Sequence, residues 1–228
     1  MQFSRVFRVG TRSSPLALKQ VDEVLGLLKG LNPDFKAEVI SRDTYGDLDK
    51  ITPISEIEGT DFFTKEIDDA LLKGDIDFAV HSAKDMPDRI LEGVYVAAIT
   101  KPLNPCDCLV SKNNLKLREL PVGAIIGTSS LRRKMQLKNF RSDLKIVDIR
   151  GNIQERLRKL EEADFDGIIV AACALIRMGL TDRITERIPF EILKPHPLQG
   201  SLVVVVRKND SDLIKLFSKI DSRETIKV

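Results

Sequence analysis

A strand, turn and helix pattern that occurs twice is the feature that most restricts how this chain can fold. Residues 5–9 alternate like a strand, lead into the turn GTRSSPL at 10–16, and precede apolar residues at helical spacing. A short apolar strand at 123–128 leads into the similar turn GTSSL at 127–131 and a second helix. Both turns place serines where a helix begins, a position at which the hydroxyl caps free N–H groups. We therefore predict two similar α/β halves.

Two proline-rich segments, 101–105 and 189–197, predict where the chain passes between these halves. A complete alternation of strands and helices lies between them, and the apolar strand SLVVVV at 201–206 follows the second segment. Two crossings make a hinge with a cleft between the domains. The predicted parts are domain 1 (1–100 and 201–218), domain 2 (105–194) and a tail (219–228).

The stretch from 127 to 160 concentrates positive charge. It contains ten Lys and Arg residues and three acidic residues, a net charge of +7 in a chain whose formal net charge is +2. Arg132 and Arg133 fall in the first turn of the predicted helix, where cations oppose the helix dipole but free N–H groups attract anions. An anionic ligand would reconcile the two effects, and a solvated basic helix face is the alternative. The clustering of serines, glycines and arginines at strand ends favours the ligand.

A second polar segment follows the continuous apolar strand at 76–80, whose pattern is typical of a buried parallel sheet. This segment is HSAKDMP, at 81–87. Open α/β sheets bind ligands at the carboxyl edge of their strands, so the segment is a second candidate site. Asp85 has two interpretations, a turn residue ahead of Pro87 or a functional carboxylate beside the arginines.

Composition argues against several other classes of protein. No apolar run approaches the roughly 18 residues that span a bilayer, and the amino terminus MQFSRVFRVG lacks the features of a signal peptide. We therefore expect a cytoplasmic protein without a membrane partner. Separately, we expect a monomer. Aromatic residues make up 5% of the chain and Trp is absent, which argues against nucleic-acid binding. Two histidines and three cysteines argue against a metal site and for reduced structural thiols.

Short motifs spread along the chain carry a resemblance to a known family. They are TRSSPLA at 11–17, GD at 46–47, HSAKDMP at 81–87, GTSSLRR at 127–133, RGNIQERL at 150–157, ALIRMGL at 174–180 and LQG at 198–200. In this order, and over nearly the whole chain, they resemble the porphobilinogen deaminase (hydroxymethylbilane synthase) family. The resemblance implies a cytoplasmic transferase of tetrapyrrole (haem) biosynthesis that condenses four porphobilinogen molecules head to tail and releases ammonia at each step. It also implies two periplasmic-binding-protein-like α/β domains, joined by a two-crossing hinge, with the active-site cleft between them.

The resemblance assigns roles to individual residues. Asp85 matches the family's catalytic aspartate, a carboxylate that can stabilise the cationic methylene-pyrrolenine left by loss of the amine and can shuttle protons. Porphobilinogen carries an acetate and a propionate, for which bidentate arginine is a suitable partner. The residues expected to bind these carboxylates or to assist are Arg12, Ser14, Ser82, Lys84, Thr128, Ser129, Arg132, Arg133, Arg150, Gly151, Arg156 and Arg177.

The family's primer is a dipyrromethane cofactor, which a cysteine of a third, carboxy-terminal domain holds through a thioether. This chain ends at 226–228, where that domain would begin, and none of its three cysteines lies in a matching motif. We therefore expect dipyrromethane without covalent attachment to this chain. Three explanations stay open: a separate carboxy-terminal polypeptide as a partner, a truncated chain, or a primer held noncovalently. Cys173 is expected in the core, whereas Cys106 and Cys108 could reach the mouth of the cleft.

Residues 51–61 are predicted to form a mobile loop. The family has lysines and a GGKG-like segment there, whereas this sequence has Glu56 and EGTD at 58–61. This difference weakens any role of the loop in binding carboxylates.

Two other functions fit the same pattern. Two α/β lobes with anion-binding helix starts also describe a solute- or oxyanion-binding protein, or the effector domain of a transcription regulator. An incomplete deaminase that needs a separate cofactor domain would bind pyrroles or polycarboxylates without turnover. Lys84 and Asp85 favour the enzyme, because a bare anion receptor gains nothing from a carboxylate. Release of ammonia from porphobilinogen distinguishes the enzyme from the binding proteins.

Overall fold

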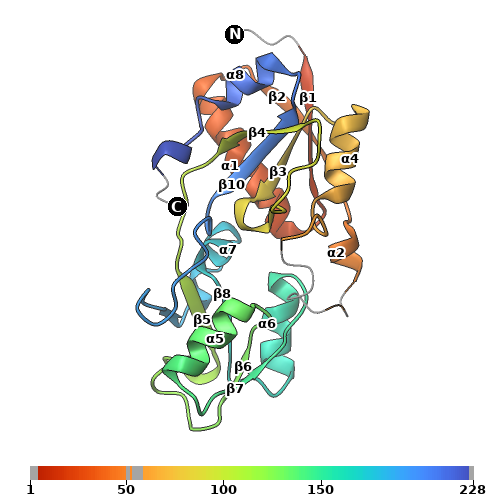
Figure 1. Ribbon diagram of the computed structural model, residues 1–228. Helices are drawn as coiled ribbons and strands as arrows, with labels where there is room; N and C mark the ends of the chain where they lie inside the picture. The colour runs from red at the N-terminus through yellow and green to blue at the C-terminus, as the bar shows by residue number, and fades with distance from the viewer. Residues whose placement is uncertain (1–4, 50–51, 53–58, 226–228) are drawn as a thin grey trace. The chain divides into compact units, whose positions relative to one another are not determined.

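The computed structural model describes residues 5–49, 52 and 59–225 of the 228-residue chain. The chain divides into two compact units, coloured by residue number in Figure 1. The first unit holds the described residues of Met1–Asp49, Glu58–Leu103 and Gly200–Val228, and the second holds those of Lys50–Ile57 and Asn104–Gln199. That these units are domains with the predicted limits, joined by a hinge, stays a prediction.

The first unit is built on a mixed five-stranded sheet. In spatial order its strands are β2 (Lys36–Arg42), β1 (Val6–Arg12), β3 (Phe78–Ser82), β10 (Leu202–Arg207) and β4 (Val94–Ile99). β1 pairs in parallel with β2 and β3, whereas β10 runs antiparallel to β3 and β4. The apolar run near the end of the sequence therefore completes the sheet that the first residues begin.

Helices cover both faces of this sheet. They are α1 (Pro15–Leu31), α4 (Lys65–Lys73) and α8 (Ser211–Phe217). Val9 of β1 belongs to the apolar core that α1 and α8 share. Successive residues of a strand point to opposite faces, and a side chain at Gly10 would come within 3.2 Å of Ile67 of α4. The sheet therefore lies between α4 on one face and α1 with α8 on the other.

The ends of these helices follow from their sequences. Ser14 caps α1, because its hydroxyl accepts a hydrogen bond from the amide of Ala17, and Pro15 occupies the first helical position. α4 ends at Gly74, whose φ of 80° is easily reached only by glycine. The start of α1 confirms the prediction that a serine of the first turn caps the helix.

The second unit repeats the topology of the first. In spatial order its strands are β7 (Lys145–Val147), β6 (Ile125–Gly127), β8 (Gly167–Ala171), β5 (Asp107–Ser111) and β9 (Glu186–Arg187). β6 pairs in parallel with β7 and β8, and β5 runs antiparallel to β8 and β9. Each strand has a counterpart at the same place in the first sheet, which confirms the prediction of two similar α/β halves.

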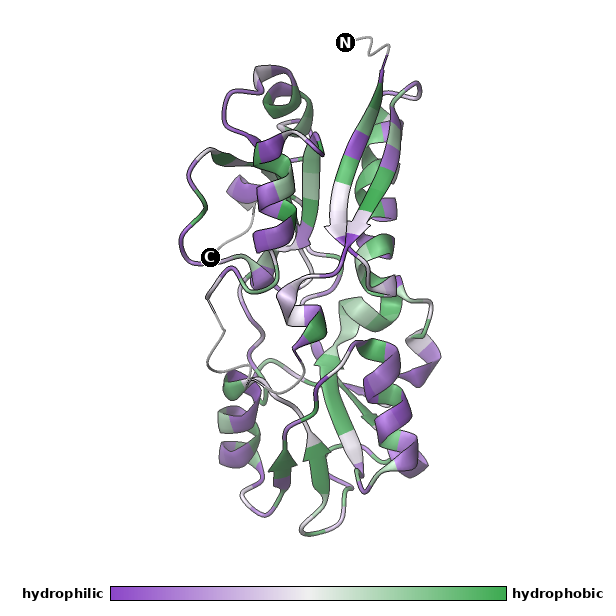
Figure 2. Cartoon of the chain, turned by 90° about the vertical axis from the view of Figure 1, so that its right-hand side faces the viewer, coloured by the Kyte–Doolittle hydropathy of each residue, from purple (hydrophilic) through white to green (hydrophobic). Residues whose placement is uncertain are grey.

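Helices also cover both faces of the second sheet. They are α5 (Leu131–Phe140), α6 (Ile153–Glu162) and α7 (Ala172–Arg177). Leu137 of α5 shares one apolar cluster with Ile169 of β8, whereas Leu157 of α6 shares another with the neighbouring Ile168. Figure 2 shows hydrophobic residues concentrated in the strands, while the helices alternate between hydrophilic and hydrophobic residues.

Short elements complete the described residues. They are α2 (Tyr45–Leu48) and the 3₁₀ turns η1 (Ala83–Asp85), η2 (Lys112–Asn114), η3 (Thr181–Arg183) and η4 (Arg223–Thr225). Most of the predicted loop at 51–61, including Glu56, lies outside the described residues. In the part of the chain that the structure describes, no helix is long and apolar enough to cross a membrane.

Candidate functional site

The strand ends hold most of the predicted site residues. In each unit three neighbouring strands run parallel, so their carboxyl ends lie at the same edge of the sheet. In the first unit β1 ends at Arg12 and β3 ends at Ser82. In the second unit β6 ends at Gly127, directly before Thr128. Both repeated turns therefore lie at the edge where α/β sheets bind ligands.

Arg12 is held by an acidic partner in its own unit. Its Nε donates to Asp47 Oδ2 at 3.1 Å, and its Nη2 donates to Asp47 Oδ1. Asp47 also accepts from the Thr44 hydroxyl at 2.8 Å, and the guanidinium carbon of Arg12 lies 4.7 Å from the centre of the Phe63 ring. These contacts orient Arg12, because Asp47 occupies the Nε and Nη2 edge of its guanidinium and the Phe63 ring covers one face.

The turn after β3 carries the predicted catalytic residue. Ser82 accepts a hydrogen bond from Gln20 Nε2 at 2.8 Å. Lys84 and Asp85 follow on η1 and are half-buried. Their side chains make no hydrogen bond or ion pair with any other residue that the structure describes. Asp85 is one of the predicted site residues, and its carboxylate is therefore open to a ligand.

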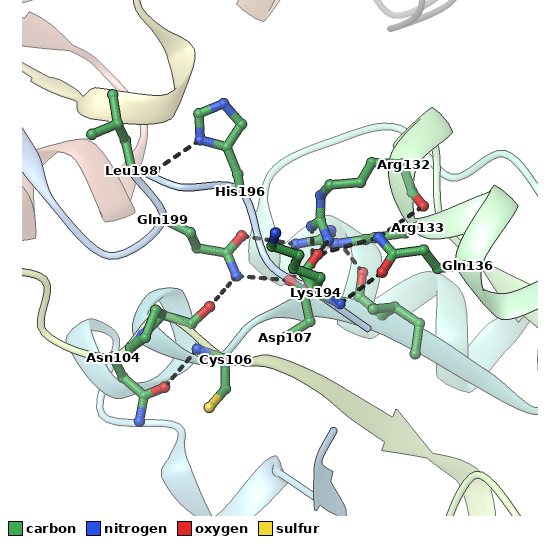
Figure 3. Close-up of polar contacts among 12 residues, drawn as sticks. Asn104, Cys106, Asp107, Arg132, Arg133, Gln136, Lys194, His196, Leu198 and Gln199 are labelled. Atoms are coloured by element: carbon green, nitrogen blue, oxygen red, sulfur yellow. Dashed lines mark hydrogen bonds and ion pairs between the residues drawn. The ribbon is translucent and has the colours of Figure 1, made fainter. Parts of the chain in front are cut away.

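Two arginines of α5 share one buried carboxylate (Figure 3). Asp107, the first residue of β5, is fully buried. Its Oδ1 accepts from Arg133 Nε at 3.1 Å and Nη2 at 2.6 Å, and its Oδ2 accepts from Arg132 Nη2 at 2.7 Å. Arg133 is buried, whereas Arg132 keeps 24% of its side chain exposed. One carboxylate opposite two guanidinium groups leaves the cluster with a net charge of +1. Arg132 is the member that exposes this charge to solvent.

Glutamine side chains fix this cluster to the segment before β10. Gln199 Nε2 donates to Asp107 Oδ1 at 2.9 Å and to the carbonyl of Pro105 at 2.7 Å, and Figure 3 shows its amide pointing at the carboxylate. Gln136 accepts from the amide of Lys194 at 2.7 Å, and Arg132 Nη1 donates to the carbonyl of Lys194. The position of Arg132 therefore depends on residues far from it in the sequence.

Arginines hold both carboxylates in their charged form. Burial opposes ionisation of Asp107, but the guanidinium groups of Arg133 and Arg132 outweigh burial and hold the pKa of this carboxyl below its ordinary value. Burial likewise opposes ionisation of Asp47, and the hydrogen bonds and charge of Arg12 lower its pKa. Both carboxylates serve to neutralise and orient arginines.

The repeated turn is used differently in the two units. In the first unit the Thr11 hydroxyl donates to the carbonyl of Val80 at 3.3 Å. The corresponding carbonyl in the second unit, that of Ile169, accepts from Arg133 Nη1 at 3.2 Å instead. Thr128 is fully buried, and its hydroxyl has no hydrogen-bond partner among the described residues.

Ser129 has a clear structural contact. Its hydroxyl donates to the carbonyl of Ile149 and accepts from the Ile149 amide, each at 3.0 Å. It thereby joins the turn after β6 to the segment after β7. Ser130 occupies the N-cap position of α5 without a side-chain capping bond.

The remaining predicted residues lie at the start of α6 and the end of α7. Arg150 Nη1 donates to the carbonyl of Thr52 at 2.6 Å, and Arg156 Nε donates to the carbonyl of Gly151 at 2.8 Å. Gly151 has a φ of 112°, which strains any other residue. Arg177 is the last residue of α7 and is half-buried.

The predicted residues thus form separate groups. In the second unit Arg132 and Arg133 share Asp107, while Arg150, Gly151 and Arg156 form a group at the start of α6. In the first unit Arg12, Ser82 and Lys84 with Asp85 lie at the ends of β1 and β3. Their binding and catalytic roles, and the cleft expected between the halves, stay predictions.

Sequence reasoning did not identify the residues that hold the arginines. Asp107 is an isolated acidic residue at the start of a strand, and no local pattern distinguishes it. Gln199 and Asp47 lie within the LQG and GD motifs, which carried the resemblance but did not indicate a contact. Gln20, which donates to Ser82, was not identified either, and its only sequence signal was a polar residue on the otherwise apolar face of α1.

The cysteines differ from the prediction at one position. Cys173 is buried, as predicted. Cys108 is also fully buried, in the core beneath α6, and burial raises the pKa of its thiol to about 12. The expectation that Cys108 could reach a cleft was wrong, because alternation along β5 turns its side chain into the apolar core. Cys106 is half-buried.

Comparison with known proteins identifies the family. The family model described as "Porphobilinogen deaminase, dipyromethane cofactor binding domain" matches residues 7–215. The chain belongs to the porphobilinogen deaminase family. It is 46% identical over 221 residues to the porphobilinogen deaminase of Pelotomaculum thermopropionicum, covering 97% of this chain and 71% of that protein. It is 45% identical over 222 residues to the porphobilinogen deaminase of Bacillus subtilis, again covering 97% of this chain and 71% of the relative.

Solved structures of two binding proteins have a similar fold. The methionine-binding protein MetQ has a TM-score of 0.56 at 15% identity and covers 94% of this chain and 89% of its own. The probable amino-acid ABC transporter extracellular-binding protein YtmK of Bacillus subtilis has a TM-score of 0.54 at 15% identity, over 95% of this chain and 90% of its own. At such identities the likeness shows the fold alone, and it confirms the predicted periplasmic-binding-protein-like α/β architecture.

Proposed function

We propose that this protein is a hydroxymethylbilane synthase that condenses four porphobilinogen molecules head to tail, with loss of ammonia, in the cytoplasm. The observation that carries the proposal is the Asp85 carboxylate. It is half-buried on the turn after β3, in a chain of the porphobilinogen deaminase family, and has no partner among the described residues. Asp47 and Asp107, by contrast, are occupied by arginines.

The chemistry of the substrate suits these residues. Loss of ammonia from porphobilinogen leaves a cationic methylene-pyrrolenine, and a nearby carboxylate stabilises that charge and can carry a proton to or from the pyrrole. Asp85 takes this role. The ammonium group of the adjacent Lys84 is suited to a substrate carboxylate.

The arginines near the strand ends bind the carboxylates of the substrate. Each pyrrole brings an acetate and a propionate, and guanidinium groups bind carboxylates bidentately. Arg132 supports this role because its cluster carries a net charge of +1 and its side chain is partly exposed. Arg133 has a different task, since its hydrogen bonds go to buried partners, and we assign it to positioning Asp107.

The residues present also fit the dipyrromethane cofactor that the family description names. Dipyrromethane is itself a pyrrole polycarboxylate, and the exposed edge of Arg132 is a donor for such a group. When bound, it supplies the primer to which pyrroles are added. Covalent attachment through Cys108 or Cys173 is not proposed, because both thiols are buried.

The proposal predicts the effect of one substitution. Asp85→Asn removes the charge but keeps the shape of the side chain, so the fold should persist while ammonia release from porphobilinogen falls by at least about a hundredfold. The matched control is Asp88→Asn, because Asp88 is an exposed carboxylate three residues further on. Near-normal turnover by a folded Asp85→Asn variant would remove Asp85 from the mechanism.

A second prediction concerns carboxylate binding. Arg132→Leu should weaken binding of a porphobilinogen analogue with methyl in place of aminomethyl by about tenfold or more, because a charged hydrogen bond is lost. Arg118→Leu is the control, since Arg118 stacks on Phe140 elsewhere in the same unit. Calorimetric titration measures both, and equal affinities in the two variants would exclude Arg132 from recognition.

The alternative function is a protein that binds pyrrole polycarboxylates without turnover and needs a separate cofactor domain. It predicts analogue binding that depends on Arg132 but no ammonia from porphobilinogen. Addition of a cofactor-bearing polypeptide separates a dependent enzyme, which then releases ammonia, from a binding protein, which does not.

A further inference from the structure

The end of β3 is tied to its neighbours directly before the turn that carries Asp85. Ser82, the last residue of the strand, accepts from Gln20 of α1 at 2.8 Å. The amide of Ala83 donates to the carbonyl of Ser201, directly before β10, at 3.1 Å. Only one residue lies between Ala83 and Asp85. The position of the Asp85 carboxylate therefore depends on how firmly this strand end is held.

A buried ion pair makes a third contact, on the opposite face of the sheet. Side chains alternate along a strand, so His81 points away from α1 and toward the face that α4 covers. Its Nε2 lies 3.3 Å from Oδ1 of Asp68, in the first turn of α4. The two side chains are 3% and 4% exposed, and neither of these atoms has another hydrogen-bond partner among the described residues. An ionised carboxylate only accepts, so the imidazole supplies the proton of this contact.

Stability alone does not explain a pair of this kind. Taking both charges out of water opposes folding, and a buried ion pair can often be replaced by apolar residues of similar size without loss of stability. α4 also buries Ile67 and Leu71, so apolar side chains already supply its packing. Apolar contacts have no preferred direction, whereas a charged donor that faces a carboxylate fixes the distance and direction between α4 and the strand end. The pair therefore suits a role in positioning.

We propose that the Asp68–His81 pair holds the end of β3 in place and thereby positions the Asp85 carboxylate for its reaction. Asp68 and His81 are positioning residues: they act through the strand and the turn, and they do not touch the substrate. This inference rests on the proposed function and deepens it, because it extends the catalytic machinery to a helix on the far side of the sheet from α1. Its signature is a loss of turnover without a loss of substrate binding, because the arginines that bind the carboxylates are unchanged.

The test replaces the pair in the full chain by apolar residues of similar total size, Asp68→Ala together with His81→Phe. Urea unfolding should show that stability is retained. Amide hydrogen exchange, followed by NMR, should be about tenfold faster at Ala83 than in the wild type, because the strand end loses a charged contact. Exchange within β1 should stay unchanged.

The same variant is assayed for ammonia release from porphobilinogen, with a cofactor-bearing polypeptide added where the wild type alone is inactive. We expect kcat to fall about tenfold or more while KM changes by less than about twofold, since the contact acts on the reaction and not on binding. Asp68→Asn keeps the shape of the side chain and removes its charge. It should change exchange and kcat in the same direction by about threefold, so the test does not depend on folding of the double variant.

Asp69→Asn is the matched control, since Asp69 is the next residue of α4 and its side chain is 39% exposed. It should leave exchange at Ala83 and kcat unchanged. Unchanged exchange at Ala83, equally faster exchange in β1, or near-normal kcat in the folded Asp68 variants overturns the positioning role. The exchange measurement needs no turnover, so it tests the pair even if the wild type releases no ammonia. That last result would contradict the proposed function, and the two failures are thus distinguishable.

Discussion

Asp107 illustrates how one residue can create a basic site. Two guanidinium groups side by side repel each other, and burying one of them without a counter-charge costs several kcal/mol. Asp107 offsets this cost for Arg133 and holds Arg132 at the same time. The cluster keeps a net charge of +1, so the residue that neutralises the buried arginine also leaves the exposed one available for an anion.

A prediction at this scale concerns pH. The folded pKa of Asp107 lies below the ordinary value of about 3.9, so its stabilising contribution is fully present above about pH 4 and is lost as the pH falls through the folded pKa. Asp107→Asn should lower the free energy of unfolding at pH 7 by about 3 kcal/mol. It should also make stability depend less on pH between 5 and 3.

Urea unfolding of wild type and variant at pH 7, 5, 4 and 3 measures both effects. The matched control is Asp88→Asn, which removes an exposed carboxylate. A parallel fall of stability with pH in wild type and in Asp107→Asn would show that this carboxylate is not what the acid titrates.

At the scale of elements, one arrangement occurs twice in the second unit: a helix begins shortly after a strand ends. α5 follows β6 and α6 follows β7, but the two helices are capped differently. The Asn152 side chain accepts from the Glu155 amide at 3.0 Å, and Glu155 Oε2 accepts from the Asn152 amide at 2.7 Å. This capping box fixes the start of α6 next to Arg150 and Arg156. Ser130 makes no such bond, and the two arginines of α5 are held through Asp107 instead.

This difference predicts unequal costs for the same kind of substitution. Asn152→Ala should lower the free energy of unfolding by about 1 kcal/mol, because it removes a capping hydrogen bond. Ser130→Ala removes no capping bond and should cost clearly less. The midpoint of urea unfolding, followed by circular dichroism, measures both variants. Equal losses would mean that the Asn152 cap does not stabilise α6 as its geometry indicates.

Local sequence was a good guide to individual elements. The strand predicted at 201–206 lies within one residue of β10 at Leu202–Arg207, and the serine-capped start of α1 was also predicted. The strand predicted at 76–80 lies two residues further on, as β3 at Phe78–Ser82. Propensity and periodicity report on neighbouring residues, so they locate elements well and their ends less well.

At the scale of the whole molecule, the duplication could be predicted, and the partners of the site residues could not. The repeated turn was enough to infer two similar halves, because each half builds its sheet from its own strand, turn and helix units. The contacts that hold the arginines join Asp107 to Gln199 and Arg12 to Asp47, which lie 92 and 35 positions apart. Such pairs depend on tertiary packing, and a single sequence carries no periodic signal for them.

The proposed function requires an enzyme that acts four times on one kind of substrate, and the two units offer different chemistry for this task. The second unit contributes the net positive cluster at Arg132. The first unit contributes the half-buried Asp85 carboxylate. We interpret this difference as a division between recognition of polycarboxylates and the chemistry of the aminomethyl group.

The central claim is tested most directly by the amount of ammonia released per tetrapyrrole formed. Purified protein is incubated with porphobilinogen, with the cofactor-bearing polypeptide added if the protein alone is inactive. Ammonia is assayed enzymatically, and the product is measured by the absorbance of the porphyrin it forms. We predict four molecules of ammonia for each hydroxymethylbilane, and no such release by Asp85→Asn. Binding of porphobilinogen without any release of ammonia, under both conditions, would contradict the claim and identify a binding protein.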